Sequence, residues 1–187
     1  VNQTSSGGDF MVDVLKTLDI EYLAMNCASS FRGLHEAVIN HGGNKKPEII
    51  TCPHEEIAVH MGQGYAKMEG KPLAMICHGV VGLQHASMAM YNAWCDRVPV
   101  IVMGGNIMEA DKRAPGAEWP HSAIDPAALT RDFVKWDDQP ASLQHFAESA
   151  MRAYKISTTP PMAPVMLSLD QELQENPIEN RDRLRIP

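Results

Sequence analysis

The sequence lacks long apolar runs, clusters of basic residues and closely spaced cysteines, and each absence excludes a class of protein. No apolar run approaches the ~20 residues that a membrane-spanning helix needs, so we expect no membrane segment. With 16 Lys and Arg against 23 Asp and Glu the net charge is -7, and no basic run suited to a phosphate backbone is present. We therefore expect no nucleic-acid partner.

The four cysteines are widely separated and form no CxxC pair. Most of them lie in apolar stretches, which favours buried, reduced thiols over a disulfide framework or a zinc site, and we predict no metal site in this chain. Reduced thiols and the lack of a recognisable signal peptide predict a cytoplasmic protein. Because the first residue is Val1 rather than Met, a targeting segment removed before this position stays open as an alternative.

The hydrophobic pattern of the 187 residues alternates between helical spacing and short continuous apolar runs, which is typical of helices and buried parallel strands. Ser6 is the expected N-cap of the first helix, Pro53 is expected in the first turn of the third, and Gly104 is expected to close the fourth strand. We predict a first helix that follows Ser6 and has its apolar residues at 10–18, further helices at 31–40, 53–69, 83–95 and 141–157, and strands at 22–25, 47–52, 73–77, 98–103 and 165–169.

These elements predict an α/β domain of three layers over residues 1–170, a mostly parallel sheet with helices on both faces. Residues 106–125 lose the periodicity and are expected to form a surface loop. The tail, residues 171–187, is polar, contains proline and has no evident apolar face, so we predict a linker toward a following domain.

Ligands of an open parallel sheet bind beyond the carboxyl ends of its strands, so the residues that follow each strand are the candidates for a site. Familiar motifs are absent there: His54 and His60 are six residues apart, not the four of a helical zinc site, and no GxSxG occurs. Glu55, expected in the first turn of a helix, remains. Taken alone, it is typical of a solvated glutamate near the positive end of a helix dipole.

The wider pattern around Glu55 is more specific. Residues 53–67, PHEEIAVHMGQGYAK, are followed by GKP at 70–72, by a glycine-containing loop at 79–82 and by YNAWCDRVPV at 91–100. In order and spacing these elements resemble the pyrimidine-binding domain of thiamin-diphosphate enzymes such as acetolactate synthases and benzoylformate decarboxylases. The resemblance extends from about residue 10 to residue 169.

The resemblance implies catalytic roles for Glu55 and His78. Glu55 matches the glutamate that hydrogen-bonds the aminopyrimidine ring of the cofactor, promotes its imino tautomer and so favours formation of the ylid. His78 coincides with an active-site histidine of benzoylformate decarboxylase, which implies that it relays protons. The alternative for His78 is a strand-end histidine satisfied by backbone groups.

The resemblance also implies cofactor contacts in two loops. Cys27, Ala28 and Ser29 lie where the family has a Pro-Gly-Gly or Pro-Gly-Ser turn, and Ser29 matches a serine able to bind a substrate carboxylate. An ordinary turn residue is the alternative for Ser29. Gly82 and His85 match a glycine and an asparagine of the cofactor-contacting loop.

The GDG…N motif, by which the family's second domain binds Mg²⁺ and the diphosphate, is absent from this sequence. The resemblance therefore implies a homo-oligomer, a dimer or tetramer, in which a neighbouring subunit supplies that domain, and we expect this chain to be inactive alone. The polar tail favours a piece of a longer polypeptide over a separate subunit. His121 is expected to be a surface histidine. The alternative is that its side chain extends into the cleft of the candidate cofactor site.

The function predicted in this way is the cofactor-activating half of a 2-oxo acid decarboxylase or carboligase, that is, part of a lyase or transferase. Its substrate would be a small 2-oxo acid and its cofactor thiamin diphosphate with Mg²⁺. The alternative is a non-catalytic dimerisation or assembly module of the same fold. Retention of Glu55 favours the enzyme, since a module that only assembles needs no buried carboxyl group.

Overall fold

The computed structural model describes residues 5–109 and 122–187, so His121 lies outside the described residues. The strands are β1 (Tyr22–Met25), β2 (Glu48–Thr51), β3 (Leu73–Cys77), β4 (Val100–Asn106), β5 (Asp137–Asp138) and β6 (Val165–Asp170). The α-helices are α1 (Gly7–Thr17), α2 (Arg32–Asn40), α3 (Glu55–Glu69), α4 (Gly79–Cys95), α5 (Leu143–Thr158) and α6 (Gln171–Glu175). Short 3₁₀ helices are η1 (Ser29–Phe31), η3 (Pro126–Leu129), η4 (Arg131–Phe133) and η5 (Arg181–Arg183).

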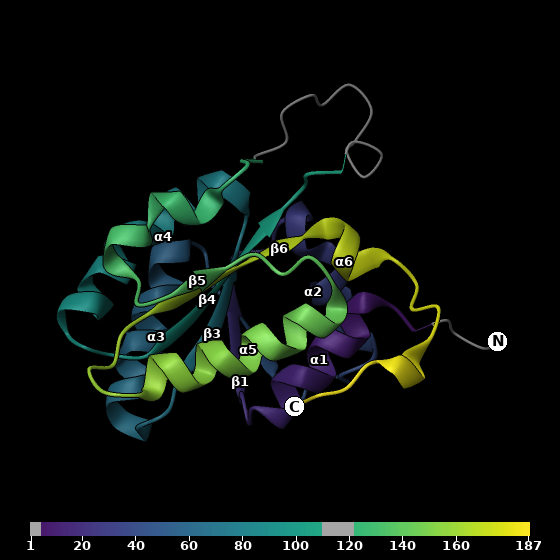
Figure 1. Ribbon diagram of the computed structural model, residues 1–187. Helices are drawn as coiled ribbons and strands as arrows, with labels where there is room; N and C mark the ends of the chain where they lie inside the picture. The colour runs from purple at the N-terminus through teal and green to yellow at the C-terminus, as the bar shows by residue number, and fades with distance from the viewer. Residues whose placement is uncertain (1–4, 110–121) are drawn as a thin grey trace.

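The strands form one six-stranded sheet in the order β2-β1-β3-β4-β6-β5, and every pairing is parallel. Helices α1, α2, α5 and α6 cover one face, and α3 and α4 cover the other (Figure 1). The predicted three-layer α/β fold is confirmed. Because the strands run in one direction, the residues that follow β1, β3 and β4 meet at one edge of the sheet.

Two apolar cores lie on the two faces of this sheet because successive side chains of a strand point to opposite sides. In β3, Ala74 and Ile76 join the core under α1, α2 and α5, whereas Leu73, Met75 and Cys77 join the core under α3 and α4. All five side chains are buried. The central strands are therefore apolar throughout, as the continuous runs in the sequence indicated.

The helix starts correct two predictions and confirm a third. Ser6 caps α1 in a capping box with Asp9, as predicted. Pro53 precedes α3 instead of lying in its first turn, because His54 is the N-cap and its Nδ1 accepts from Glu56 N at 3.2 Å. Helix α4 begins at Gly79, four residues before the predicted start at 83.

The fourth strand does not end at its glycines. Gly104 and Gly105 pair with Ser168 and Leu169 of β6, and β4 continues to Asn106. Glycine lacks a side chain but retains both backbone hydrogen-bonding groups, so it continues a ladder wherever close packing needs the space.

The tail after β6 folds back onto the domain, so the prediction that it has no apolar face is wrong. Leu173, Ile178, Leu184 and Ile186 pack against the core, and Ile178 N donates to Ser5 O at 2.8 Å. These apolar residues are irregularly spaced around a proline, which hid them from a search for helix or strand periodicity. That the chain continues into another domain stays a prediction. Over residues 5–109 and 122–187, no helix has the length and apolarity that a membrane crossing requires.

Candidate functional site

Glu55 lies at the carboxyl edge of the sheet as the first residue of α3, and only 5% of it is exposed. The link from β2 is short: Cys52 N donates to Met25 O at 2.7 Å, which keeps this segment beside β1. Asn26, the residue after β1, donates from Nδ2 to Glu55 Oε1 at 3.3 Å. The sequence alone favoured a solvated glutamate at this position, whereas the fold buries it.

Gly82 gives the Glu55 carboxyl its room. A Cβ on Gly82 would stand 3.0 Å from Glu55 Oε1 and 3.2 Å from Cys77 Cβ, so a side chain there would force its neighbours to move by a few tenths of an ångström. Cys77 is fully buried behind it. Burial, together with the charge of Glu55, raises the pKa of the Cys77 thiol, which therefore stays neutral.

The surroundings of Glu55 fit a neutral, hydrogen-bonding ligand. Among the residues that the structure describes, no Lys, Arg or His makes an ion pair with this carboxyl. A carboxyl group that is nearly buried and held by a neutral amide is suited to share a proton with a ring nitrogen. A carboxyl group in this setting fits the aminopyrimidine of the cofactor that the sequence implies.

His78 joins the same edge of the sheet from the end of β3. It is the N-cap residue of α4, and its Nδ1 lies 2.8 Å from Ser30 Oγ. Gly79 N donates to the same oxygen at 3.2 Å. The loops after β1 and β3 are thus joined through one hydroxyl.

From the sequence, Ser29 was given a role in the loop after β1, whereas Asn26 and Ser30 of the same loop were given none. Ser29 is exposed, whereas Ser30 is fully buried against His78. Nothing in the sequence distinguishes the two adjacent serines, because their burial depends on β4. Asn26, as a polar residue directly after a strand, carried the signal by which it could have been found.

The other predicted site residues lie in two places. In the loop after β1, Cys27 is exposed, and Ala28 has an extended backbone with φ of -153° and packs partly against the core. This conformation needs no glycine. His85 is on the exposed side of α4, where its ring packs edge-to-face on His54 with centroids 4.8 Å apart. The contacts of these residues with a cofactor stay predictions.

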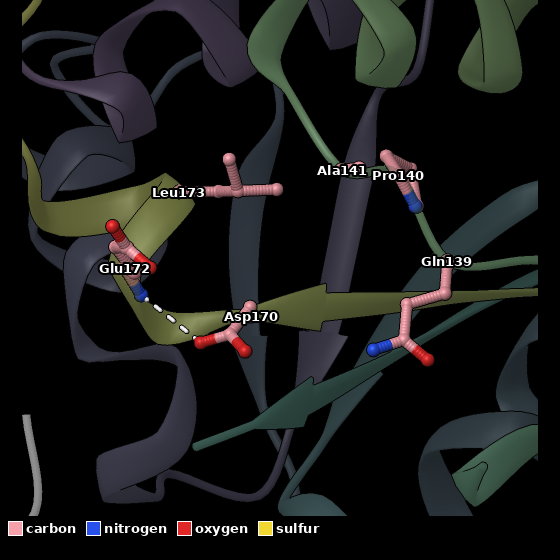
Figure 2. A pocket seen from close by; sticks show the side chains of 6 residues that line it. All are labelled: Gln139, Pro140, Ala141, Asp170, Glu172 and Leu173. Atoms are coloured by element: carbon pink, nitrogen blue, oxygen red, sulfur yellow. Dashed lines mark hydrogen bonds between the residues drawn. The ribbon is translucent and has the colours of Figure 1, made fainter. Parts of the chain in front are cut away.

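A separate pocket of about 440 Å³ lies beyond β6 (Figure 2). Its lining includes none of the predicted site residues; it comprises Gln139, Pro140, Ala141, Asp170, Glu172 and Leu173. The Asp170 carboxylate accepts from Glu172 N at 3.2 Å, as the N-cap of α6, and from Met108 N at 3.3 Å. Within the described ranges no three His, Cys, Asp or Glu side chains are grouped so as to hold a metal ion.

Several signature residues lie far from Glu55, at the opposite edge of the sheet. Glu21, just before β1, accepts from Tyr65 Oη at 2.5 Å and from Lys71 Nζ at 2.8 Å. Burial and the hydrogen bond to Glu21 raise the pKa of Tyr65 to about 12. Tyr65 of the GYAK segment and Lys71 of the GKP segment thus connect the end of α3 and the start of β3 to the residue before β1.

The chain matches known proteins over most of its length. The family model for the thiamine pyrophosphate enzyme N-terminal TPP binding domain matches residues 5–129. Benzoylformate decarboxylase of Pseudomonas aeruginosa is 28% identical over 146 residues, 73% of this chain. Acetolactate synthase of Bacillus subtilis is 25% identical over 150 residues, 80% of this chain. The matches span 27% and 25% of the lengths of these two relatives.

Solved structures share the fold. Benzoylformate decarboxylase from Polynucleobacter necessarius superimposes on 96% of this chain and 32% of its own, with a TM-score of 0.79 and 21% identity. A putative thiamin diphosphate-dependent enzyme from Mycobacterium smegmatis covers 98% of this chain and 34% of its own, with a TM-score of 0.80 and 22% identity. With a family model that matches well over half of its residues, the chain belongs to the N-terminal TPP-binding domains of thiamine pyrophosphate enzymes.

Proposed function

We propose that this chain is the cofactor-activating half of a thiamin-diphosphate-dependent 2-oxo acid decarboxylase or carboligase, with Glu55 as its proton-sharing group. The observation that carries the proposal is the nearly buried Glu55 carboxyl, bonded by Asn26 and given room by Gly82. Membership of a TPP-binding family and the names of the similar decarboxylase and synthase support the reaction class.

Glu55 holds a proton between its carboxyl group and a ring nitrogen of the bound aminopyrimidine. Burial serves this role because water would otherwise compete for the same oxygens, and Asn26 fixes the carboxyl by its bond to Oε1. When bound, thiamin diphosphate supplies the nucleophilic carbon that adds to a 2-oxo acid and accepts the electrons released with carbon dioxide.

His78 is the proposed second proton-transferring group. It lies at the carboxyl edge of the sheet, as Glu55 does, but on a different loop, and its ring is held by Ser30. An imidazole exchanges protons readily near neutral pH, whereas a carboxyl group ordinarily does so under more acidic conditions. The two groups can therefore act on different protons of one reaction.

The remainder of the site is proposed to come from a neighbouring subunit. The diphosphate and Mg²⁺ would be bound by a second domain of the protein, and the active unit would be a homodimer or homotetramer. This chain alone is expected to lack turnover.

The test uses the complete protein, in which Glu55→Gln is compared with Glu56→Gln. Glu56 belongs to the same helical turn but lies about 100° around the axis, so it is a matched control. We expect Glu55→Gln to lower turnover and exchange of the cofactor C2 proton by about 10²–10⁴-fold, the usual contribution of general acid–base catalysis. Equal rates in the two variants would disprove the assignment.

Calorimetry separates the proposal from an assembly module of the same fold. The complete wild-type protein, titrated with thiamin diphosphate and Mg²⁺, is expected to release heat that saturates at one cofactor per site. A module kept only for assembly would give no saturable heat.

A further inference from the structure

Ser30 occupies a space that a glycine of the neighbouring strand leaves open. The side chain is fully buried. Across from it in β4, a Cβ on Gly105 would stand 2.4 Å from Ser30 Oγ and 2.6 Å from Ser30 O. These separations exclude any side chain at position 105. The Ser30 hydroxyl can therefore pack against β4 only because residue 105 is a glycine.

The Ser30 hydroxyl has two partners at the start of α4, and their chemistry determines where its proton goes. Gly79 N, 3.2 Å away, is a donor only and therefore uses a lone pair of Oγ. His78 Nδ1, 2.8 Å away, is the acceptor that the described residues offer to this buried hydroxyl. A buried hydroxyl that donates to nothing costs free energy, so donation to Nδ1 is the favoured arrangement.

We propose that Ser30 is a positioning residue that holds His78 in a single tautomer. With Nδ1 accepting from Ser30, the neutral ring carries its proton on Nε2. The imidazole is then a hydrogen-bond donor at Nε2 before any proton is transferred. This inference rests on the proposed function: neutral His78 donates a hydrogen bond from Nε2 to an oxygen of the 2-oxo acid, and a proton leaves the ring only from the imidazolium form, in which both nitrogens carry one.

The tautomer can be measured directly in the complete protein labelled with ring-¹⁵N histidine. His78→Asn assigns the two ring resonances by their loss. In the wild type near neutral pH we expect Nδ1 to give the signal of an unprotonated nitrogen and Nε2 that of a protonated one. A wild-type spectrum with the proton on Nδ1 would overturn the proposal.

The role of Ser30 is tested by Ser30→Ala, with Ser29→Ala as the matched control at the adjacent exposed serine. Ser30→Ala should mix the two tautomers and lower kcat by about tenfold, the value of one hydrogen bond, with a changed pH profile. Ser29→Ala should leave the His78 resonances unchanged. A Ser30→Ala spectrum identical to that of the wild type would also overturn the proposal.

The turnover of His78→Asn separates this inference from the function on which it rests. Reduced turnover of His78→Asn, together with the expected tautomer in the wild type, supports both. Full turnover overturns the role of His78 and with it the catalytic part of this proposal, even where the spectrum shows the expected tautomer. The wrong tautomer with reduced turnover overturns the role of Ser30 and leaves the proposed function standing.

Discussion

The backbone of Gly82 lies against the carboxyl group of Glu55, so that a Cβ on the glycine would stand 3.0 Å from Oε1. The same Cβ would meet Cys77, which belongs to the fully buried strand β3, at 3.2 Å. The carboxyl is therefore confined between a helix and a strand, and the first turn of α4 determines how much space it has.

Gly82→Ala is expected to displace the Glu55 carboxyl. Overpacking of this kind costs about 1–3 kcal/mol. Where this cost is borne by displacement of the Glu55 carboxyl, binding of thiamin diphosphate weakens roughly tenfold to hundredfold. Calorimetry of the complete protein measures this effect. Gly64→Ala is the control: an added Cβ there meets nothing within 4 Å, and removing a helical glycine should stabilise the protein by about 0.5–1 kcal/mol. Equal cofactor affinity in both variants would contradict the expectation.

The four cysteines should react in a fixed order with a thiol reagent. Cys27 and Cys95 are exposed, whereas burial raises the pKa of Cys52 and of Cys77. We expect Cys27 and Cys95 to be alkylated first, as read by mass spectrometry of peptides. Thiamin diphosphate with Mg²⁺ should slow labelling of Cys27 and leave Cys95 unchanged. Protection of neither thiol would argue against a cofactor contact in the loop after β1.

Alkaline pH should destabilise the protein through Tyr65. Burial and the bond to Glu21 raise the pKa of Tyr65 from 10.0 to about 12, so folding favours the protonated hydroxyl. The stability that the protonated Tyr65 hydroxyl contributes is fully present below pH 10 and is lost as the pH rises to about 12. The free energy of unfolding, from urea titrations across that interval, should fall less in Tyr65→Phe than in the wild type. Glu21→Gln, which removes the negative charge beside the Tyr65 hydroxyl, should reduce the fall as well; parallel curves for all three proteins would refute the assignment.

Gln174→Ala should destabilise the domain. This fully buried amide accepts from Leu34 N at 3.3 Å and donates to Ser30 O at 3.1 Å and Leu169 O at 3.3 Å. Each buried backbone group that loses its partner costs about 1–3 kcal/mol. Urea unfolding should therefore show a clear loss of stability, whereas Gln139→Ala, at an exposed glutamine, should match the wild type.

The sequence was sufficient for five of the six strands and for α1 to α5 because their apolar patterns are unambiguous, whereas the two-residue strand β5 and the short helix α6 were not predicted. Residues 73–77 were predicted as a strand with the bounds that the structure has. The predictions failed where local chemistry competes with distant packing: Gly104 resembles a strand end but continues β4, and the residues after Asp170 resemble a linker but pack on the core. In both cases the deciding partner is remote in the sequence.

The candidate site was only partly accessible from sequence for the same reason. Glu55 was identified by resemblance, since a first-turn glutamate alone indicates a solvated side chain. Asn26 and Ser30 gain their contacts from α3, α4 and β4, three segments that no local pattern relates to the loop after β1.

The bonds of Glu21 to Tyr65 and Lys71 also bear on the alignment of Glu55. Helix α3, from Glu55 to Glu69, is about 22 Å long at 1.5 Å per residue, and these bonds hold the end remote from the carboxyl. A tilt of roughly 3° about that end would move Glu55 by about 1 Å, a displacement large enough to cost an enzyme about a hundredfold in rate. We therefore expect the alignment of Glu55 to depend, to within a few degrees, on side chains at the other end of α3.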